Sequence, residues 1–91
     1  MIINRWLEAE GFKLEAYSAE GYDCDYEKVI PHDDIYILYV DVSLRDKKVY
    51  FYEEYDCGGE VSSYTATIPG DMDLWSSSFI CWLNEEIEEY I

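Results

Sequence analysis

The middle of the chain alternates between apolar and polar residues, a period of two that predicts half-buried β-strands. The longest alternating run covers residues 35–44. One face comprises Leu38, Val40, Val42 and Leu44, and the other comprises Ile37, Tyr39, Asp41 and Ser43. β-branched and aromatic residues of this kind suit a pleated, packed surface. We therefore expect residues 35–44 to form a central strand.

The segments that follow this run predict a meander. Residues 45–48 are expected to form a hairpin turn, and residues 49–55 alternate again on a returning strand. Residues 56–60, with their glycine pair, predict the next turn. Residues 61–68 then alternate as a further strand.

Two shorter alternating runs precede the central strand. Residues 12–17 predict one half-buried strand, and residues 22–27 predict another. Residues 29–34 contain Pro31, and we expect them to form a connection. If residues 22–27 are extended, one face of that strand is wholly acidic, with Asp23, Asp25 and Glu27.

The two ends of the chain have helical periodicity. Near the N-terminus, Ile3, Trp6 and Leu7 recur at helical spacing before Gly11 ends the pattern. Near the C-terminus, Asp71 or Asp73 is expected to cap a helix that runs to about residue 90. The apolar face of this last helix comprises Trp75, Phe79, Trp82, Leu83, Ile87 and Tyr90.

These elements predict an α+β fold in one acidic domain, residues 1–91. We expect an antiparallel β-sheet of four or five strands with an N-terminal and a C-terminal helix packed on it. A chain of 91 residues buries about 60 to 65% of the surface that its unfolded form exposes, so the core must be small.

Charge changes this picture more than any motif does. The chain carries 21 Asp and Glu against 6 Lys and Arg, a formal net charge of -15, although 49% of its residues are apolar and 18% aromatic. Such a composition folds, yet solubility alone calls for a net charge of only about 2 to 8 in magnitude. No Lys or Arg follows Lys48. A merely acidic or halophilic protein is one explanation, and an acidic binding surface is the other.

Catalytic chemistry has little support in the sequence. His32 is the single histidine, and Cys24, Cys57 and Cys81 are odd in number without the CxxC spacing of a redox or zinc site. A pair of His32 with Cys24 or Cys57 stays open, but no known catalytic motif is present. We expect no catalytic residues, no cofactors and no enzyme activity. Without a signal peptide or an apolar run of membrane-spanning length, we expect a cytoplasmic location and no membrane contact.

Calcium binding is a second possibility raised by the pattern Asp23-x-Asp25-x-Glu27. The pattern is similar to the start of a calcium-binding loop, but it lacks the glycine at loop position six and the terminal bidentate glutamate. Strand alternation explains the same spacing, so we expect no metal site.

The carboxylates themselves are the third candidate. Side chains two residues apart on a strand point the same way at a distance of about 6.6 Å, close to two phosphate steps of about 3.4 Å along one DNA strand. Several clusters recur along the chain, and we expect them to bind a basic partner: Asp23, Asp25, Glu27, Asp33, Asp34, Glu53, Glu54, Asp56, Glu60, Glu85, Glu88 and Glu89.

The last of these clusters breaks a local rule. Glutamates in the final turns of a helix face the negative end of the helix dipole, which costs about 0.3 to 1 kcal/mol for each charge, and a rule broken without compensation indicates function. Glu86 falls on the apolar face of the helix, so it should emerge at the edge of the core. Tyrosines turned outward could serve as anchors within the acidic rim, with candidates at Tyr36, Tyr39, Tyr50, Tyr52 and Tyr55.

In size, net charge and tyrosine-rich α+β pattern, the chain resembles the small acidic DNA-mimic and anti-CRISPR proteins that phages encode. The resemblance covers composition over the whole chain and no residue motif. It implies a stoichiometric anti-defence inhibitor in the bacterial cytoplasm that fills the basic groove of a nuclease complex, with a CRISPR effector or another nuclease as the partner. Direct nucleic-acid binding is not expected, and either a monomer or a homodimer is compatible. The chain also resembles the acidic immunity proteins that neutralise basic nuclease toxins of bacteria.

Overall fold

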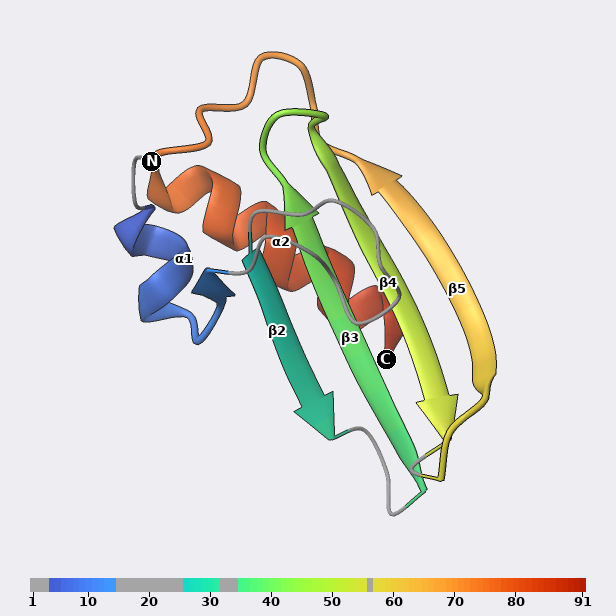
Figure 1. Ribbon diagram of the computed structural model, residues 1–91. Coiled ribbons are helices and arrows are strands. Elements are labelled where there is room, and N and C mark those ends of the chain that lie inside the picture. Colours follow the sequence, from blue (N-terminus) through green and yellow to red (C-terminus); the bar gives the residue numbers. More distant parts are fainter. Residues whose placement is uncertain (1–3, 15–25, 32–34, 56) are drawn as a thin grey trace.

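The computed structural model describes residues 4–14, 26–31, 35–55 and 57–91, without the side chains of residues 60 and 61. Its five strands form one antiparallel sheet in which each strand pairs with its neighbour in sequence (Figure 1). The predicted α+β fold is therefore confirmed, with five strands rather than four. In chain order the elements are α1 (Arg5–Ala9), β1 (Lys13–Leu14), β2 (Tyr26–Pro31), β3 (Tyr36–Ser43), β4 (Lys48–Tyr55), β5 (Glu60–Thr67) and α2 (Ser77–Tyr90).

The hairpin of β3 and β4 forms the middle of the sheet. Val40 lies opposite Phe51 and Val42 lies opposite Val49, so four apolar side chains line up across the two strands. All four are buried. The alternation in residues 35–44 predicted both the strand and its inward face, and β3 is indeed the central strand of the five.

One face of the sheet is covered by α2, which runs diagonally across it from the side of α1 to the side of β4 (Figure 1). Four helix residues are buried, as expected for an amphipathic helix on a sheet: Phe79, Ile80, Leu83 and Ile87. At roughly 1.5 to 3 kcal/mol for each fully buried large apolar side chain, this contact supplies much of the driving force for folding. We call the face covered by α2 the helix face and the other one the second face.

The helix begins later than the sequence pattern predicts. Asp73 does not cap α2: its Oδ1 accepts a hydrogen bond from the Trp75 backbone nitrogen at 3.0 Å, and its backbone carbonyl accepts one from Ser76 Oγ at 2.8 Å. Asp and Ser stabilise turns in this way at the expense of helix. Trp75 therefore lies in the turn before α2, where its side chain is 45% exposed, and not on the apolar face of the helix.

The short helix α1 is held at the edge of the sheet by Asn4, which is fully buried. Its Oδ1 caps the helix by accepting from the Trp6 and Leu7 backbone nitrogens at 3.0 and 3.2 Å. Its Nδ2 donates to the Leu74 carbonyl at 2.8 Å, and its backbone nitrogen donates to the Tyr26 hydroxyl at 2.7 Å. One residue thus joins α1, β2 and the segment before α2.

The N-terminal strands differ from the sequence prediction. Residues 29–31 belong to β2 and do not form a connection. β1 pairs only with the start of β2, so the later part of β2 has no neighbour on its outer side among the described residues. Proline is tolerated on such an edge because it lacks the N–H that an inner strand would need, which explains Pro31. Within the predicted strand 12–17, β1 comprises two described residues, Lys13 and Leu14.

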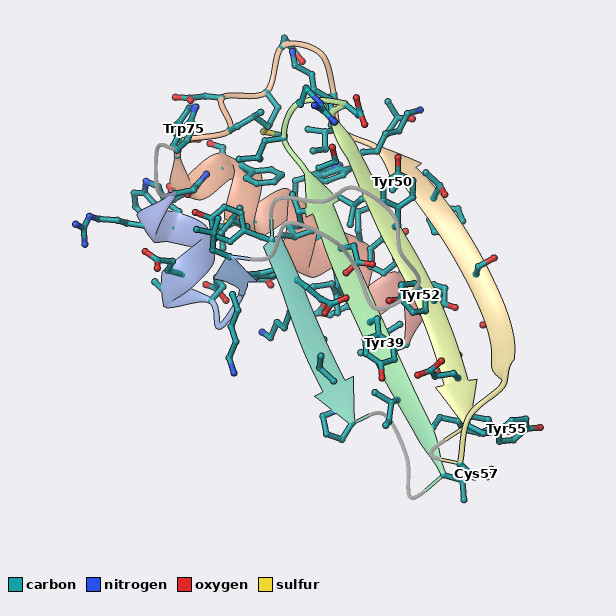
Figure 2. The ribbon with its side chains drawn as sticks, viewed as in Figure 1. Tyr39, Tyr50, Tyr52, Tyr55, Cys57 and Trp75 are labelled. Carbon is teal, nitrogen blue, oxygen red and sulfur yellow. The ribbon has the colours of Figure 1, made fainter. Side chains whose placement is uncertain are left out.

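The second face carries a row of tyrosines that Figure 2 shows on the side turned away from α2. Tyr39 and Tyr52 are cross-strand partners whose rings stack with centroids 4.9 Å apart. Tyr52 and the neighbouring Asp41 are buried there. Among the described residues, neither helix has the length and apolar composition needed to cross a membrane.

Candidate partner-binding surface

The C-terminal end of α2 is strongly acidic. Four glutamates occupy its last two turns: Glu85, Glu86, Glu88 and Glu89. The last turn contains no basic residue, and no described side chain forms an ion pair with any of the four. The negative charges thus stand at the negative end of the helix dipole without local compensation, as the sequence predicts.

Three aromatic rings lie beside this acidic end and connect it to the sheet. Tyr90 of α2 stacks on Phe51 of β4 with centroids 5.3 Å apart, and Tyr64 of β5 is 5.9 Å from Phe51 and 6.4 Å from Tyr90. Phe51 is buried, but Tyr64 is 51% exposed. The cluster therefore offers an accessible tyrosine ring that is fixed from below by a core residue.

A chain of hydrogen bonds extends the cluster to a carboxylate of β4. The hydroxyls of Tyr90 and Ser62 lie 2.6 Å apart, and Ser62 Oγ donates to Glu53 Oε1 at 3.3 Å. Side chains from β4, β5 and α2 are thus brought together from positions up to 37 residues apart in sequence. We call this set the carboxylate–tyrosine surface: Glu53, Tyr64, Glu86, Glu89 and Tyr90.

The surface is hollowed at its centre. A shallow depression of about 340 Å³ is lined by Tyr64, Glu86, Glu89 and Tyr90. On the outer side of the same helix end, a second depression of about 300 Å³ is lined by Glu85, Glu88 and Glu89. Glu89 borders both, so the two depressions form one acidic region around the end of α2.

The electrostatic state of Glu86 reflects this crowding. Partial burial at the edge of the core raises the pKa of its carboxyl above the usual range, and the neighbouring charges of Glu89 and Glu85 raise it further. The side chain is half-buried, as expected for a residue that emerges at the edge of the core, and it lines the depression together with Tyr64. A positive charge in the depression would favour the ionised carboxylate and so lower this pKa again.

The carboxylates that adjoin in sequence on β4 are separated in space. Glu53 lies opposite Leu38 and Ser62 on the helix face, whereas Glu54, the next residue, lies opposite Ile37 on the second face. Strand alternation therefore divides the predicted cluster between the two sides of the sheet. Only Glu53 joins the carboxylate–tyrosine surface.

Glu27 also lies on the second face, far from the end of α2 in the topology of the sheet. It is the cross-strand partner of Asp41, and its Oε2 accepts a hydrogen bond of 3.4 Å from the Tyr52 hydroxyl. A carboxylate of this kind already has a partner within the fold. The remaining predicted residues lie outside the described residues or have undescribed side chains: Asp23, Asp25, Asp33, Asp34, Asp56 and Glu60.

The tyrosines of the surface were missed by sequence reasoning, which favoured the rows of β3 and β4. Tyr52 is buried, and Tyr36 and Tyr55 pair with each other at the end of the sheet, with centroids 5.2 Å apart. Figure 2 places Tyr55 beside Cys57 there, at the end opposite Trp75. The pairing of Tyr64 with Tyr90 depends on the register of β5 against β4 and on the angle of α2. No local pattern in the sequence encodes either quantity.

The chemistry available at this surface is recognition of positive charge. Carboxylates can accept paired hydrogen bonds from a guanidinium, and a tyrosine face attracts a cation placed over it. Within the described part of the chain, no three His, Cys, Asp or Glu side chains are grouped closely enough to hold a metal ion.

Comparison with known proteins identifies no relative of this chain. No protein-family model, curated protein or solved structure matches this chain.

Proposed function

We propose that this protein is a stoichiometric inhibitor that binds the basic, nucleic-acid-binding groove of another protein. One observation carries the proposal: the glutamates at the end of α2 gather around an exposed tyrosine, and no described basic residue pairs with them. A groove lined by Lys and Arg holds nucleic acid through its phosphates and releases counterions when it does so. An acidic protein can occupy the same groove and release the same ions.

The sign and density of charge, together with the resemblance to phage anti-defence proteins, support one class of partner. We propose a CRISPR effector or another defence nuclease of bacteria, in whose cytoplasm the inhibitor would act. Charge complementarity also increases the association rate and makes affinity depend on salt. Binding should therefore weaken steeply between about 50 and 200 mM salt, as it does for the nucleic acid that is displaced.

Competition with nucleic acid tests the proposal. Purified candidate effectors are incubated with labelled target DNA and increasing amounts of this protein, and DNA binding and cleavage are measured on gels. We expect full loss of both activities near one equivalent of inhibitor per site. If a saturating excess leaves DNA binding and cleavage unchanged across the candidate effectors, the proposal is wrong.

A matched pair of variants locates the surface. Glu86→Gln/Glu89→Gln removes two charges from the carboxylate–tyrosine surface, and Glu8→Gln/Glu10→Gln removes two charges from the region of α1. We expect the first pair to weaken inhibition at least tenfold, about 1.4 kcal/mol of binding free energy. The second pair should change it by less than about threefold, the size of a general charge effect.

A further inference from the structure

The two edges of the sheet are protected very differently. On the β1 side, the edge strand comprises two described residues, and the part of β2 that has no outer neighbour among the described residues contains Lys28 and ends at Pro31. Lys28 Nζ also donates to the Glu10 carbonyl at 2.7 Å, which holds a charged side chain across that edge. Short strands, lysines and prolines are the usual means by which proteins prevent an edge from pairing with another chain.

The β5 edge has none of these protections over most of its length. β5 pairs only with β4 among the described residues, and residues 62–67 contain neither charge nor proline. Except for Ala66, the side chains of residues 62–67 are exposed. Alternate N–H and C=O groups of such a strand point outward, ready to pair with an additional strand.

The acidic side chains beside the β5 edge favour a positively charged partner segment. Ser62, Tyr64 and Ala66 point to the helix face, since they lie opposite Glu53, Phe51 and Val49. A strand added to β5 would lie about 4.8 Å further out. Every second side chain of that strand would then reach the helix face next to Tyr64 and the depression lined by Glu86 and Glu89.

We infer that β5 binds an extended basic segment of the partner protein by strand addition, with alternate Arg or Lys side chains directed towards the carboxylate–tyrosine surface. This inference rests on the proposed function and adds the mode of binding to it. Main-chain hydrogen bonds supply the pairing, and the side-chain positions at i and i+2 supply the specificity. A second copy of this chain fits less well, because two β5 edges would bring the glutamates of two molecules of charge -15 together.

Backbone methylation provides the test, because it removes the N–H donors of a peptide without changing its charge. The probe is the acetylated and amidated heptapeptide Arg-Thr-Arg-Thr-Arg-Thr-Arg, compared with one version N-methylated at every Thr and one N-methylated at every Arg. In an extended peptide these two versions block opposite edges. Binding is measured by calorimetry, and hydrogen exchange of the amides of β5 is followed by NMR.

We expect the parent peptide to bind, one N-methylated version to lose at least tenfold in affinity, and the other to retain the affinity of the parent. The outward amides of β5 should become protected from exchange with the parent peptide. Equal binding by all three peptides would overturn the inference. So would the absence of parent binding up to about 1 mM, a limit of roughly 4 kcal/mol. A dimer detected by sedimentation at high salt, with the outward amides of β5 protected from exchange in the absence of peptide, would also overturn it.

Failure of strand addition and failure of the proposed function give different results. If all three peptides bind equally and Glu86→Gln/Glu89→Gln weakens each of them, the acidic surface acts through side chains alone, and the proposed function stands. If the selective loss with one methylated peptide is observed while no effector is inhibited, strand addition stands and the inhibitor proposal falls.

Discussion

At the scale of single residues, Asn4 connects three parts of the fold that lie far apart in sequence. It caps α1, and it also bonds to the Leu74 carbonyl and the Tyr26 hydroxyl. We expect Asn4→Ala to lower the free energy of unfolding by about 2 to 3 kcal/mol. The lost cap contributes about 1 kcal/mol, and the Leu74 carbonyl left without its donor contributes a further 1 kcal/mol or more. Urea denaturation measures the change.

Asn84→Ala is the matched control for this substitution. Asn84 lies on α2 with its side chain half-buried, and the same atoms are deleted there. Because alanine is the better helix former, its effect should lie within about 0.7 kcal/mol of zero and favour folding. Equal destabilisation by the two substitutions would mean that the hydrogen bonds of Asn4 do not hold the helix in place.

Glu86 makes stability depend on pH in an unusual direction. Its pKa is raised in the folded protein, so the folded state favours the protonated carboxyl. The contribution of Glu86 is therefore favourable at low pH and is lost as pH rises from the ordinary pKa of a glutamate through the raised one. Glu86→Gln imitates the protonated form. We expect it to increase the free energy of unfolding at pH 7 by about 0.3 to 1 kcal/mol and to have little effect near pH 4.

Glu88→Gln is the control for Glu86→Gln. It removes one negative charge from the same helix end but at an exposed position, so it shows the effect of charge without that of burial. Glu88 is exposed and does not line the depression beside Tyr64. Chemical denaturation between pH 4 and 8 measures, for each variant, how far its free energy of unfolding differs from that of the native chain. If the change in free energy of unfolding caused by Glu86→Gln stays constant over this range, the raised pKa of Glu86 is contradicted.

At the scale of elements, the glutamates at the C-terminal end of α2 lower the stability of the helix, because they lie at the negative end of its dipole. Glu88→Lys/Glu89→Lys places cations at the helix end that prefers them, and the second of the two new lysines can pair with Glu85 one turn earlier. We expect about 1 to 2 kcal/mol of added stability together with at least tenfold weaker inhibition of the partner. The same change of charge in Glu8→Lys/Glu10→Lys should leave inhibition much closer to that of the native chain. Gain of stability without loss of inhibition would remove α2 from the proposed surface.

Sequence patterns predicted the elements whose packing follows from a local period. The alternation in residues 35–44 determines which side of β3 is buried, because a one-residue shift would expose Leu38 and Val40. The start of α2 could not be predicted in the same way. The side chain of Asp73 can cap a helix or close a turn, and the residue that follows it, Leu74, accepts a hydrogen bond from Asn4, 70 residues away, which no local pattern reveals.

The candidate surface was also predictable only in part, because some of its residues are placed by local periodicity and others by contacts between distant parts of the chain. The excess charge at the end of α2 and the emergence of Glu86 follow from helical periodicity alone. Glu53 and Glu54 form one cluster in the sequence but lie on opposite faces of β4. Tyr64 meets Tyr90 only because the register of β5 places it opposite Phe51, on which Tyr90 stacks. Register and packing angle are properties of the assembled sheet.

At the scale of the whole molecule, a net charge of -15 opposes folding and would favour the proposed binding to a basic partner. Repulsion among 21 carboxylates destabilises the compact state, and salt screens it over a Debye length that falls from about 30 Å at 0.01 M to about 8 Å at 0.15 M. We expect the melting temperature to rise with added sodium chloride. A gain of about 1 kcal/mol would appear as roughly 4 to 8 °C in a chain of this size.

The same salt titration should weaken the complex with a basic partner, because the attraction across the interface is screened together with the repulsion within the chain. Calorimetric melting of the free protein and fluorescence titration of the complex, in identical buffers from about 0.02 to 0.5 M salt, would therefore give slopes of opposite sign. Sodium sulfate and sodium chloride compared at equal ionic strength distinguish screening from stronger hydrophobic burial, which sulfate favours. An affinity that is unchanged or rises with salt would mean that the partner is held by apolar contacts, and the carboxylates would then serve another purpose.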